Sequence, residues 1–341
     1  MDQFPAEFQT SWRKTLARYQ SPELNRSLWQ LVNSTVPFLL LWYLMVRSLS
    51  TGYWLTLLLA VPAAGFLIRI FIIFHDCGHG SFFKSKKANQ MVGIFTGILT
   101  LTPYEEWTHN HAVHHATAGN LDRRGTGDVL TLTVQEYLGL PWWKKAGYRL
   151  MRNPLFMFTV GAVTVFVIGH RFPKKGSGKR ERRSVLWTNL ALAAIFVSLV
   201  AFIGWKAVIL VQAPILLIGN SIGVWMFYVQ HNFEGTYWER QENWDFLSAG
   251  MRGSSFYQLP AILQWFTGNI GFHHIHHLSP RIPNYKLQSC YEENAIFQVK
   301  PLTILTSLKS LRLRLWDEEG KQLVGYPILK RHYPPALDEA N

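Results

Sequence analysis

The sequence predicts an all-α integral membrane protein with four transmembrane helices, arranged as two hairpins, and a cytoplasmic helical cap. Hydrophobic residues make up 48% of the 341 residues and charged residues only 16%. The apolar residues gather in long runs instead of following the period of an amphipathic helix or strand. Each of the strongest runs is about 20 residues long, which is what an α-helix needs to cross the hydrocarbon core. They are residues 28–46, 53–74, 185–203 and 207–228.

Two weaker apolar runs are expected to form interfacial or re-entrant helices. Residues 92–103 are too few to cross a bilayer. Residues 154–170 are borderline in length, but the segment 171–183 that follows them carries seven basic residues and one acidic residue. Because basic residues accumulate in cytoplasmic loops, a span at 154–170 would place this segment on the wrong side. We therefore expect both chain termini and the 171–183 segment to face the cytoplasm.

The chain is expected to form a single domain, residues 1–341, whose cap comes from residues 75–184 and 229–341. Its first 27 residues are polar and lack the pattern of a cleavable signal peptide, so the first span would direct insertion. Cysteines occur only at Cys77 and Cys290. Two distant cysteines without a CxxC pair predict reduced thiols in a reducing compartment, not a disulfide framework.

The net charge of +13 admits two explanations. A basic protein can bind nucleic acid, but the sequence contains no zinc-finger spacing, aromatic RNA-binding motif or basic heptad region. Basic cytoplasmic loops beside long apolar runs account for the same charge. We therefore expect a membrane and a lipid as partners, and no nucleic acid.

Thirteen histidines occur, and eight of them fall into three short clusters. The spacing within the clusters is HxxxH, HxxHH and HxxHH. Positions i, i+3 and i+4 of an α-helix lie on one face, so each cluster can direct its imidazoles to a common point. One isolated HxxxH is weak evidence, but three such clusters on the predicted cytoplasmic side are hard to attribute to chance. The clusters are His75 and His79; His111, His114 and His115; and His273, His276 and His277.

Eight imidazoles are too many for one metal ion with tetrahedral geometry. Two ions with five or six coordination positions, some of them open, fit the number better. Imidazole binds iron, zinc, copper and nickel, so the type of residue alone does not name the metal. The sequence therefore predicts a two-metal site of unspecified element.

The histidine clusters carry a resemblance to a known family. HDCGHGSFF, HAVHH and HHIHHLSPRIPNY resemble the three histidine boxes of the membrane fatty acid desaturases. The segment Tyr228–His231 resembles the one by which that family adds a further histidine ligand. Trp244–Asp245 is similar to the acyl-lipid branch that includes the omega-6 (Δ12) enzymes, and GNLDRRGTGD is similar to bacterial acyl-lipid desaturases of the Δ5 type. The resemblance covers roughly residues 28–290.

This resemblance implies an oxygen-dependent fatty acyl desaturase that introduces a cis double bond into a lipid acyl chain. Removing hydrogens from an unactivated methylene pair needs an oxidant that no side chain provides, and the family obtains it from two ferrous ions and dioxygen. It also implies a multi-pass protein of the bacterial plasma membrane with its active site and termini in the cytoplasm. The implied iron ligands are His75, His79, His111, His114, His115, His231, His273, His276 and His277.

Four polar residues beside the clusters are candidates to orient the ligating imidazoles. A metal-bound imidazole usually donates its second N–H to a carboxylate or carbonyl, which fixes its tautomer. The candidates are Asp76, Asp128, Asn269 and Asp245. Each of them is equally consistent with a helix cap or a surface position.

The remaining candidates are expected to lie outside the metal site. His109 and His274 fall outside the box spacing, although pairing of His274 with His277 is an alternative register. Glu106 and His109 form one ExxH pair, whereas soluble di-iron bundles need two. Cys77 lies off the His75–His79 face and is expected to be a packing residue. His170 and His332 are isolated and expected to be structural, and Gly78 and Gly80 to allow close helix packing.

Three other functions compete with desaturation. A di-iron lipid or carotenoid hydroxylase or ketolase uses similar boxes, and ligand spacing alone does not distinguish it. A zinc membrane hydrolase is disfavoured because no HExxH motif or suitably placed glutamate occurs. A transporter would carry its histidines inside the spans and not after them.

Desaturation consumes electrons, and no redox-cofactor motif in this sequence would supply them. The sequence contains no haem-binding segment, CxxxxC pattern or GxGxxG motif. We therefore expect a separate electron donor, such as ferredoxin or a haem cytochrome. Basic cytoplasmic residues can contact anionic lipid headgroups and can also attract an acidic carrier.

Overall fold

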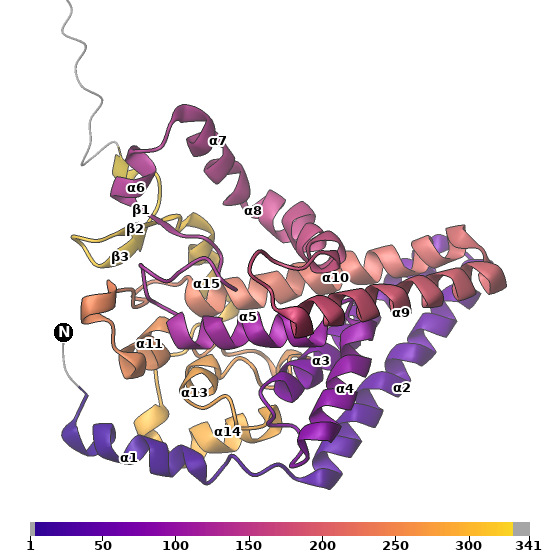
Figure 1. Cartoon of the computed structure of the whole chain (residues 1–341), viewed down its shortest axis with the longest axis horizontal. Helices are drawn as coiled ribbons and strands as arrows, with labels where there is room; N and C mark the ends of the chain where they lie inside the picture. The colour runs from indigo at the N-terminus through magenta and orange to yellow at the C-terminus, as the bar shows by residue number, and fades with distance from the viewer. Residues whose placement is uncertain (1–3, 330–341) are drawn as a thin grey trace, which may run out of the picture.

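The computed structural model describes residues 4–329 and is built mostly from helices (Figure 1). Two hairpins of long helices form its elongated part: α2 (Leu24–Ser48) with α3 (Tyr53–Gly78), and α9 (Lys179–Ile203) with α10 (Trp205–His231). Gly204 alone joins the second pair, in a left-handed conformation (φ 81°) that favours glycine. These four helices confirm the sequence-predicted hairpins, and each is long and apolar enough to cross a membrane.

The hairpins pack through small and branched side chains on α3 and α10. Ala60, Ala63, Val211 and Ile215 are fully buried in this contact. Large apolar side chains cover the opposite faces of the helices, and Phe202 on α9 is 86% exposed. Such a surface would be unstable in water but matches a hydrocarbon environment. The chain is therefore a membrane protein whose hairpins face lipid.

A fifth apolar helix, Pro154–Arg171, is also long enough to cross a membrane by length and composition alone. Its segments are α8 (Pro154–Phe156), the π-helical η1 (Met157–Gly161) and η2 (Thr164–Ile168), and η3 (Gly169–Arg171). Met157 lies in one buried cluster with Ile72, and the Phe166 ring lies 5.8 Å from the Phe71 ring. Its start packs on α10 and its end on α9. Whether this helix is interfacial, as the sequence predicts, or crosses the membrane stays a prediction.

A helical cap covers one end of the hairpins. Helix α4 (Lys86–Leu99), which contains most of the 92–103 run, packs back along α3, and α5 (Tyr104–Thr117) follows it. Helix α1 (Ala6–Ala17) lies along the outside of the cap in Figure 1 and buries Trp12 and Leu16 against it. The other cap helices are α6 (Val134–Leu138), α7 (Trp142–Met151), α11 (Phe246–Gly253), α12 (Ala261–Phe266), α13 (His273–Leu278), α14 (Asn284–Glu293), α15 (Ile304–Ser307) and the short η4 (Gln241–Asn243), η5 (Ala295–Phe297) and η6 (Leu308–Arg312).

One small sheet departs from a purely helical cap. Strand β2 (Leu315–Asp317) pairs in parallel with β1 (Leu132–Thr133) and antiparallel with β3 (Gln322–Val324). The strands are two or three residues long, too short to produce a recognisable alternation in the sequence. The sheet joins the C-terminal part of the described chain to the segment that follows the second histidine cluster.

The orientation of the 171–178 loop gives the first prediction. Lys175→Cys and Ser50→Cys place one thiol in this loop and one in the α2–α3 turn, and both positions are exposed. The native cysteines are buried, so the background labelling should be low. A membrane-impermeant maleimide should label intact cells at position 50 only, and position 175 should react after permeabilisation. Labelling of intact cells at position 175 would mean that Pro154–Arg171 crosses the membrane.

Candidate metal centre

Four elements bring the histidines together at the cap end of the hairpins. His75 lies in the last turn of α3, and His79 follows that helix. Helix α5 carries the second cluster, the six-residue α13 carries the third, and His231 is the last residue of α10. The predicted helical presentation of the clusters is thereby confirmed.

The nine sequence-predicted histidines form two adjacent groups. Within each group the ligand atoms lie within 4.8 Å of one another. One group takes its members from the first, second and third clusters; the other takes one from the second cluster, two from the third, and the histidine of α10. The groups are His75, His79, His111, His115 and His276, and His114, His231, His273 and His277.

Hydrogen bonds at the outer nitrogens fix the direction of several imidazole lone pairs. His114 Nδ1 lies 2.5 Å from the Asp128 carboxylate, and His231 Nδ1 lies 3.2 Å from the Gly253 carbonyl oxygen. Both of these oxygens only accept hydrogen bonds, so each Nδ1 must carry the hydrogen and each Nε2 must present a lone pair. The two Nε2 atoms nevertheless lie only 3.1 Å apart. Two lone pairs at this distance repel each other, and a shared cation removes the repulsion.

The other group shows the same orientation of its donor atoms. His75 Nδ1 lies 3.2 Å from Asp76, which leaves His75 Nε2 buried and without a partner among residues 4–329. His79 Nε2 is buried and unpaired in the same way. Buried polar atoms without partners are rare in folded proteins, so their presence here points to a ligand. The donor set fits two metal ions.

Burial keeps these imidazoles in the form that binds metals. Desolvation, followed by repulsion from neighbouring imidazoles, lowers their pKa values well below the ordinary value of histidine. Neutral imidazole is the metal-binding form, because protonation occupies the lone pair. The members of the two groups outside the membrane helices whose pKa values are lowered in this way are His79, His111, His115, His273, His276 and His277.

Two of the four proposed orienting residues contact histidines and two do not. Asp128 and Asp76 hold His114 and His75, as described above. Asp76 Oδ2 also accepts hydrogen bonds from the backbone N–H and side-chain amide of Asn284, at 2.7 and 2.8 Å. Asp245 instead caps α11 by accepting from the Ser248 N–H, and the Asn269 amide donates to the Asn284 carbonyl oxygen.

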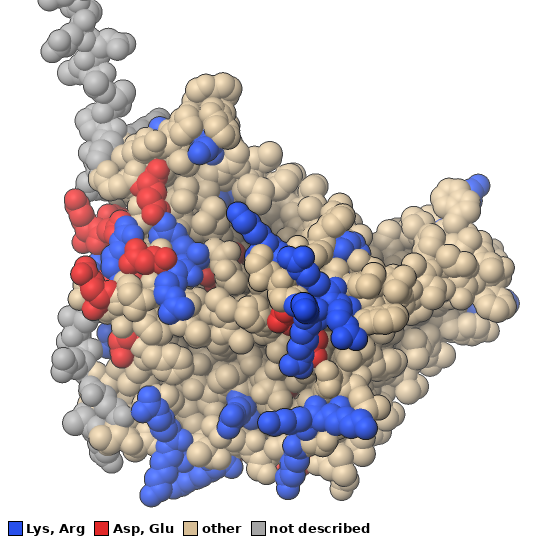
Figure 2. Space-filling model, in the orientation of Figure 1, with Lys and Arg blue, Asp and Glu red and all other residues tan. Residues whose placement is uncertain are grey.

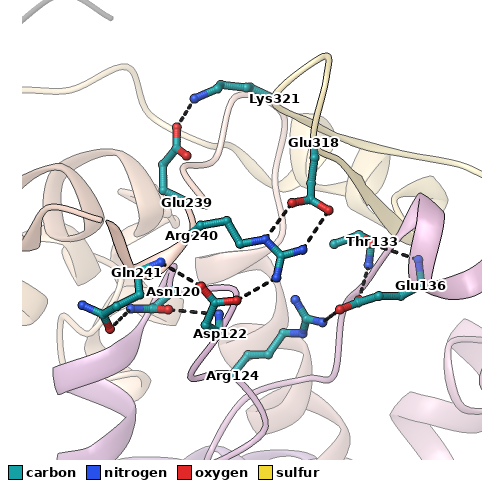
Figure 3. Close-up of polar contacts among 10 residues, drawn as sticks. All are labelled: Asn120, Asp122, Arg124, Thr133, Glu136, Glu239, Arg240, Gln241, Glu318 and Lys321. Carbon is teal, nitrogen blue, oxygen red and sulfur yellow. Dashed lines mark hydrogen bonds and ion pairs between the residues drawn. The ribbon is translucent and has the colours of Figure 1, made fainter. Parts of the chain in front are cut away.

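The loop that ends at Asp128 is fixed by a network of charges (Figure 3). Arg240 lies between Asp122 and Glu318, with nitrogen–oxygen distances of 2.7 and 2.8 Å. Beside these contacts, Arg124 of the same loop pairs separately with Glu136 of α6. These contacts join the 119–128 loop to the segment before α11 and to the β2–β3 hairpin. We infer that the network positions Asp128 against His114.

The other histidine candidates lie outside the two groups. His109 is exposed. His274 is buried, and its Nε2 lies 2.9 Å from the Phe297 carbonyl oxygen, so the alternative register with His277 is wrong. His170 packs against Phe166. His332 lies outside the described residues.

The side chains of Glu106 and Cys77 have structural contacts. Glu106 accepts hydrogen bonds from the Lys174 N–H and the Ser177 hydroxyl, so its position in an ExxH pair is a coincidence. Cys77 is buried and belongs to neither histidine group. Cys77 packs in one buried cluster with Phe74 and Tyr104, and Glu106 ties the 171–178 loop to the helix that carries the second cluster.

Sequence reasoning missed Asn284, Gly253 and Trp107. The Trp107 ring stacks on His111 with centroids 4.3 Å apart. A Cβ at Gly78 would lie 3.2 Å from this ring, which explains the glycine between α3 and α5. Gly80 serves a different purpose, because its φ of 67° turns the chain after His79. Asn284 stood in the quoted PNY motif, but Gly253 acts through its backbone and leaves no side-chain signal.

Buried neutral histidines at the end of lipid-facing helices define a membrane protein with a site suited to two metal ions. Residues 51–298 match the family described as fatty acid desaturase. The chain is 51% identical over 337 residues to the fatty acid desaturase of Bacillus subtilis (strain 168), which covers 98% of this chain and 96% of that protein. The chain therefore belongs to the fatty acid desaturase family, whose members are oxidoreductases, and the resemblance of the histidine boxes is confirmed.

More distant relatives carry more specific names. The sn-1 acyl-lipid omega-3 desaturase (ferredoxin) of a Synechocystis species is 29% identical over 237 residues, which cover 65% of this chain and 62% of that protein. The chloroplastic omega-6 fatty acid desaturase of Spinacia oleracea is 27% identical over 293 residues, which cover 81% of this chain and 63% of that protein. These relatives differ in the double bond that their names describe.

Alanine substitutions at His79, His114 and His277 test the two groups. Each should lower the metal content and abolish activity, because each removes a donor atom while the hairpins stay intact. His109→Ala is the matched control, since His109 lies on the same helix as His114 but is exposed. Metal analysis and fatty acid profiling of membranes with equal protein content measure both effects. Equal loss in the control would contradict the assignment.

Asp128→Asn tests the orientation of His114. The amide can present its NH₂ group to Nδ1 and so favour the wrong tautomer, and metal affinity or activity should fall about 10- to 100-fold. Glu319→Gln is the control, because it removes an exposed carboxylate from the turn between β2 and β3 that contacts no histidine of the site. Titration with a metal chelator measures the affinity. Equal chelator sensitivity of the Asp128 variant and the wild type would show that Asp128 does not orient a ligand.

Proposed function

We propose that this desaturase inserts a cis double bond into the acyl chain of a membrane lipid, using dioxygen and two iron ions held by the nine histidines. The observation that carries the proposal is the convergence of Nε2 lone pairs in two adjacent groups. Their position supports a lipid substrate, because the groups lie where α3 and α10 leave the lipid-facing hairpins. The names of the acyl-lipid relatives support the same substrate class.

The protein positions the acyl chain, fixes the tautomers of the ligating histidines and keeps water away from the site. Bound iron with dioxygen supplies the oxidant that removes the two hydrogens. Asp76 and Asp128 keep hydrogens on the outer nitrogens of His75 and His114, so that the inner nitrogens remain donors. Burial beneath the cap excludes water, which would otherwise compete for open metal positions. The protein must also hold the acyl chain with one methylene pair beside the metal site.

Each turnover needs electrons from outside the substrate. Reducing dioxygen to two waters takes four electrons, and the methylene pair gives two. We propose that a separate one-electron carrier, a ferredoxin or a haem cytochrome, supplies the other two. The name of the Synechocystis relative includes ferredoxin, which supports this class of donor. A basic cytoplasmic face would attract such a carrier if the carrier is acidic.

We further propose that the metal site, both termini and the 171–178 loop face the cytoplasm of a bacterium. The basic residues after the Pro154–Arg171 helix support this orientation. The loop contacts Glu106 on the helix that carries the second histidine cluster, so the loop and the metal site lie on one side of the membrane. A carrier reduced in the cytoplasm can reach a site on that side.

Product analysis with a defined donor tests the proposed reaction. Purified enzyme in lipid bilayers, with ferredoxin and its reductase, should form an unsaturated acyl chain only when air is present. Product formation at limiting carrier should fall as salt rises, because attraction between exposed charges is screened over roughly 10 Å at 0.1 M salt. A hydroxylated or keto product would identify the rival activity. Repeated turnover without any donor would refute the redox scheme, and a salt-independent rate would refute the electrostatic steering alone.

A further inference from the structure

A groove of about 480 Å³ runs between α4 and α9 at the cap end of the hairpins. On α4 it is lined by Gln90, Ile94 and Ile98, which follow one another at intervals of four residues and therefore share a face. On α9 it is lined from Lys179 to Thr188. No histidine lines the groove among the described residues, so it is separate from the metal site.

The positive charge of the groove is concentrated at the end formed by the first residues of α9. Lys179, Arg180 and Arg183 line it there, and Glu105 is the only acidic residue of the lining. Arg180 pairs with Glu105 at 2.9 Å. Lys179 and Arg183 have no carboxylate partner among residues 4–329, so the lining has two uncompensated positive charges. Figure 2 shows Lys and Arg side chains gathered over the start of α9.

The opposite end of the groove, between Ile94, Ile98 and Trp187, is apolar. Ile94 and Trp187 are 43% and 62% exposed, and Ile98 lies one turn further along α4. Their helices are lipid-facing over the same stretch, because Leu186, Leu190 and Phe95 are also exposed. A tryptophan at the boundary between a basic and an apolar surface is typical of the depth of lipid headgroups. The groove therefore changes from cationic to apolar along its length.

We propose that this groove binds one anionic glycerophospholipid that is not the substrate. Its phosphate pairs with Lys179 and Arg183, and one acyl chain lies between Ile94, Ile98 and Trp187. The lipid would reinforce the contact between α9 and the start of α5, where the Glu105 backbone N–H donates to the Ser184 hydroxyl oxygen and Arg180 pairs with the Glu105 carboxylate. Helix α5 carries three of the nine histidines. A lipid bound in the groove would therefore restrict the motion of this helix and of the histidines on it.

Charge and apolar contact can be removed separately to test this site. Lys179→Gln with Arg183→Gln removes the two unpaired charges. Ile94→Trp fills the apolar end and leaves those charges in place. Lys14→Gln with Arg18→Gln removes two exposed charges, one from α1 and one from the residue that follows it, and serves as the matched control. Purified full-length enzyme is titrated with phosphatidylglycerol or phosphatidylcholine, and bound lipid is counted by native mass spectrometry.

Wild type should retain one phosphatidylglycerol in preference to phosphatidylcholine. The double charge variant on α9 should bind phosphatidylglycerol about 30-fold more weakly at low salt, because two basic contacts are lost. Ile94→Trp should weaken binding of the same lipid, whereas the α1 variant should bind like wild type. Glycerol 3-phosphate, which lacks acyl chains, should not displace the bound lipid.

Three outcomes would overturn the proposal: equal phosphatidylglycerol retention in wild type and the α9 variant, an equal loss in the α1 variant, or displacement by glycerol 3-phosphate. The readout is lipid binding and not turnover, so these results do not depend on the proposed desaturase reaction.

Discussion

The arrangement of this protein depends on which nitrogen of each histidine carries the hydrogen. Asp128, Gly253 and Asp76 accept hydrogen bonds from Nδ1 atoms and so turn the Nε2 lone pairs of three histidines into the site. A buried polar atom without a partner costs about 1–3 kcal/mol. Several such atoms in one place would oppose folding of the cap unless cations bind them. Metal binding and cap stability are therefore expected to be coupled.

This constraint explains why the site lies where it does. Helices α3 and α10 pack along each other and bring His75 and His231 to the same end. Large apolar side chains face outward along the hairpins, whereas polar groups are buried in the cap. A lipid acyl chain would need to leave the hydrocarbon only near the last turn of these helices. The cap then supplies the histidines that the membrane helices cannot supply by themselves, because a helix can direct only two or three side chains to one point.

Much of this arrangement could be predicted from the sequence because its determinants are local. Apolar runs of span length define the hairpins, and i, i+3 and i+4 spacing places histidines on one helix face. Contacts between distant segments were not predictable in this way. Arg240 meets Asp122 and Glu318 across 118 and 78 positions of the chain, and nothing local marks those pairs. Asn284 and Gly253 were missed for the same reason. For the fifth apolar helix, length and composition permit a span, while the basic residues that follow it favour an interfacial position.

The central claim is that two neighbouring groups of histidines each hold one iron ion. Elemental analysis of active, purified protein together with Mössbauer spectra of an ⁵⁷Fe-enriched sample tests it most directly. The account predicts two irons per chain in nitrogen-rich environments, with both signals lost on substitution of His114 and His79 together. Active protein that contains stoichiometric zinc, or only one iron per chain, would contradict it.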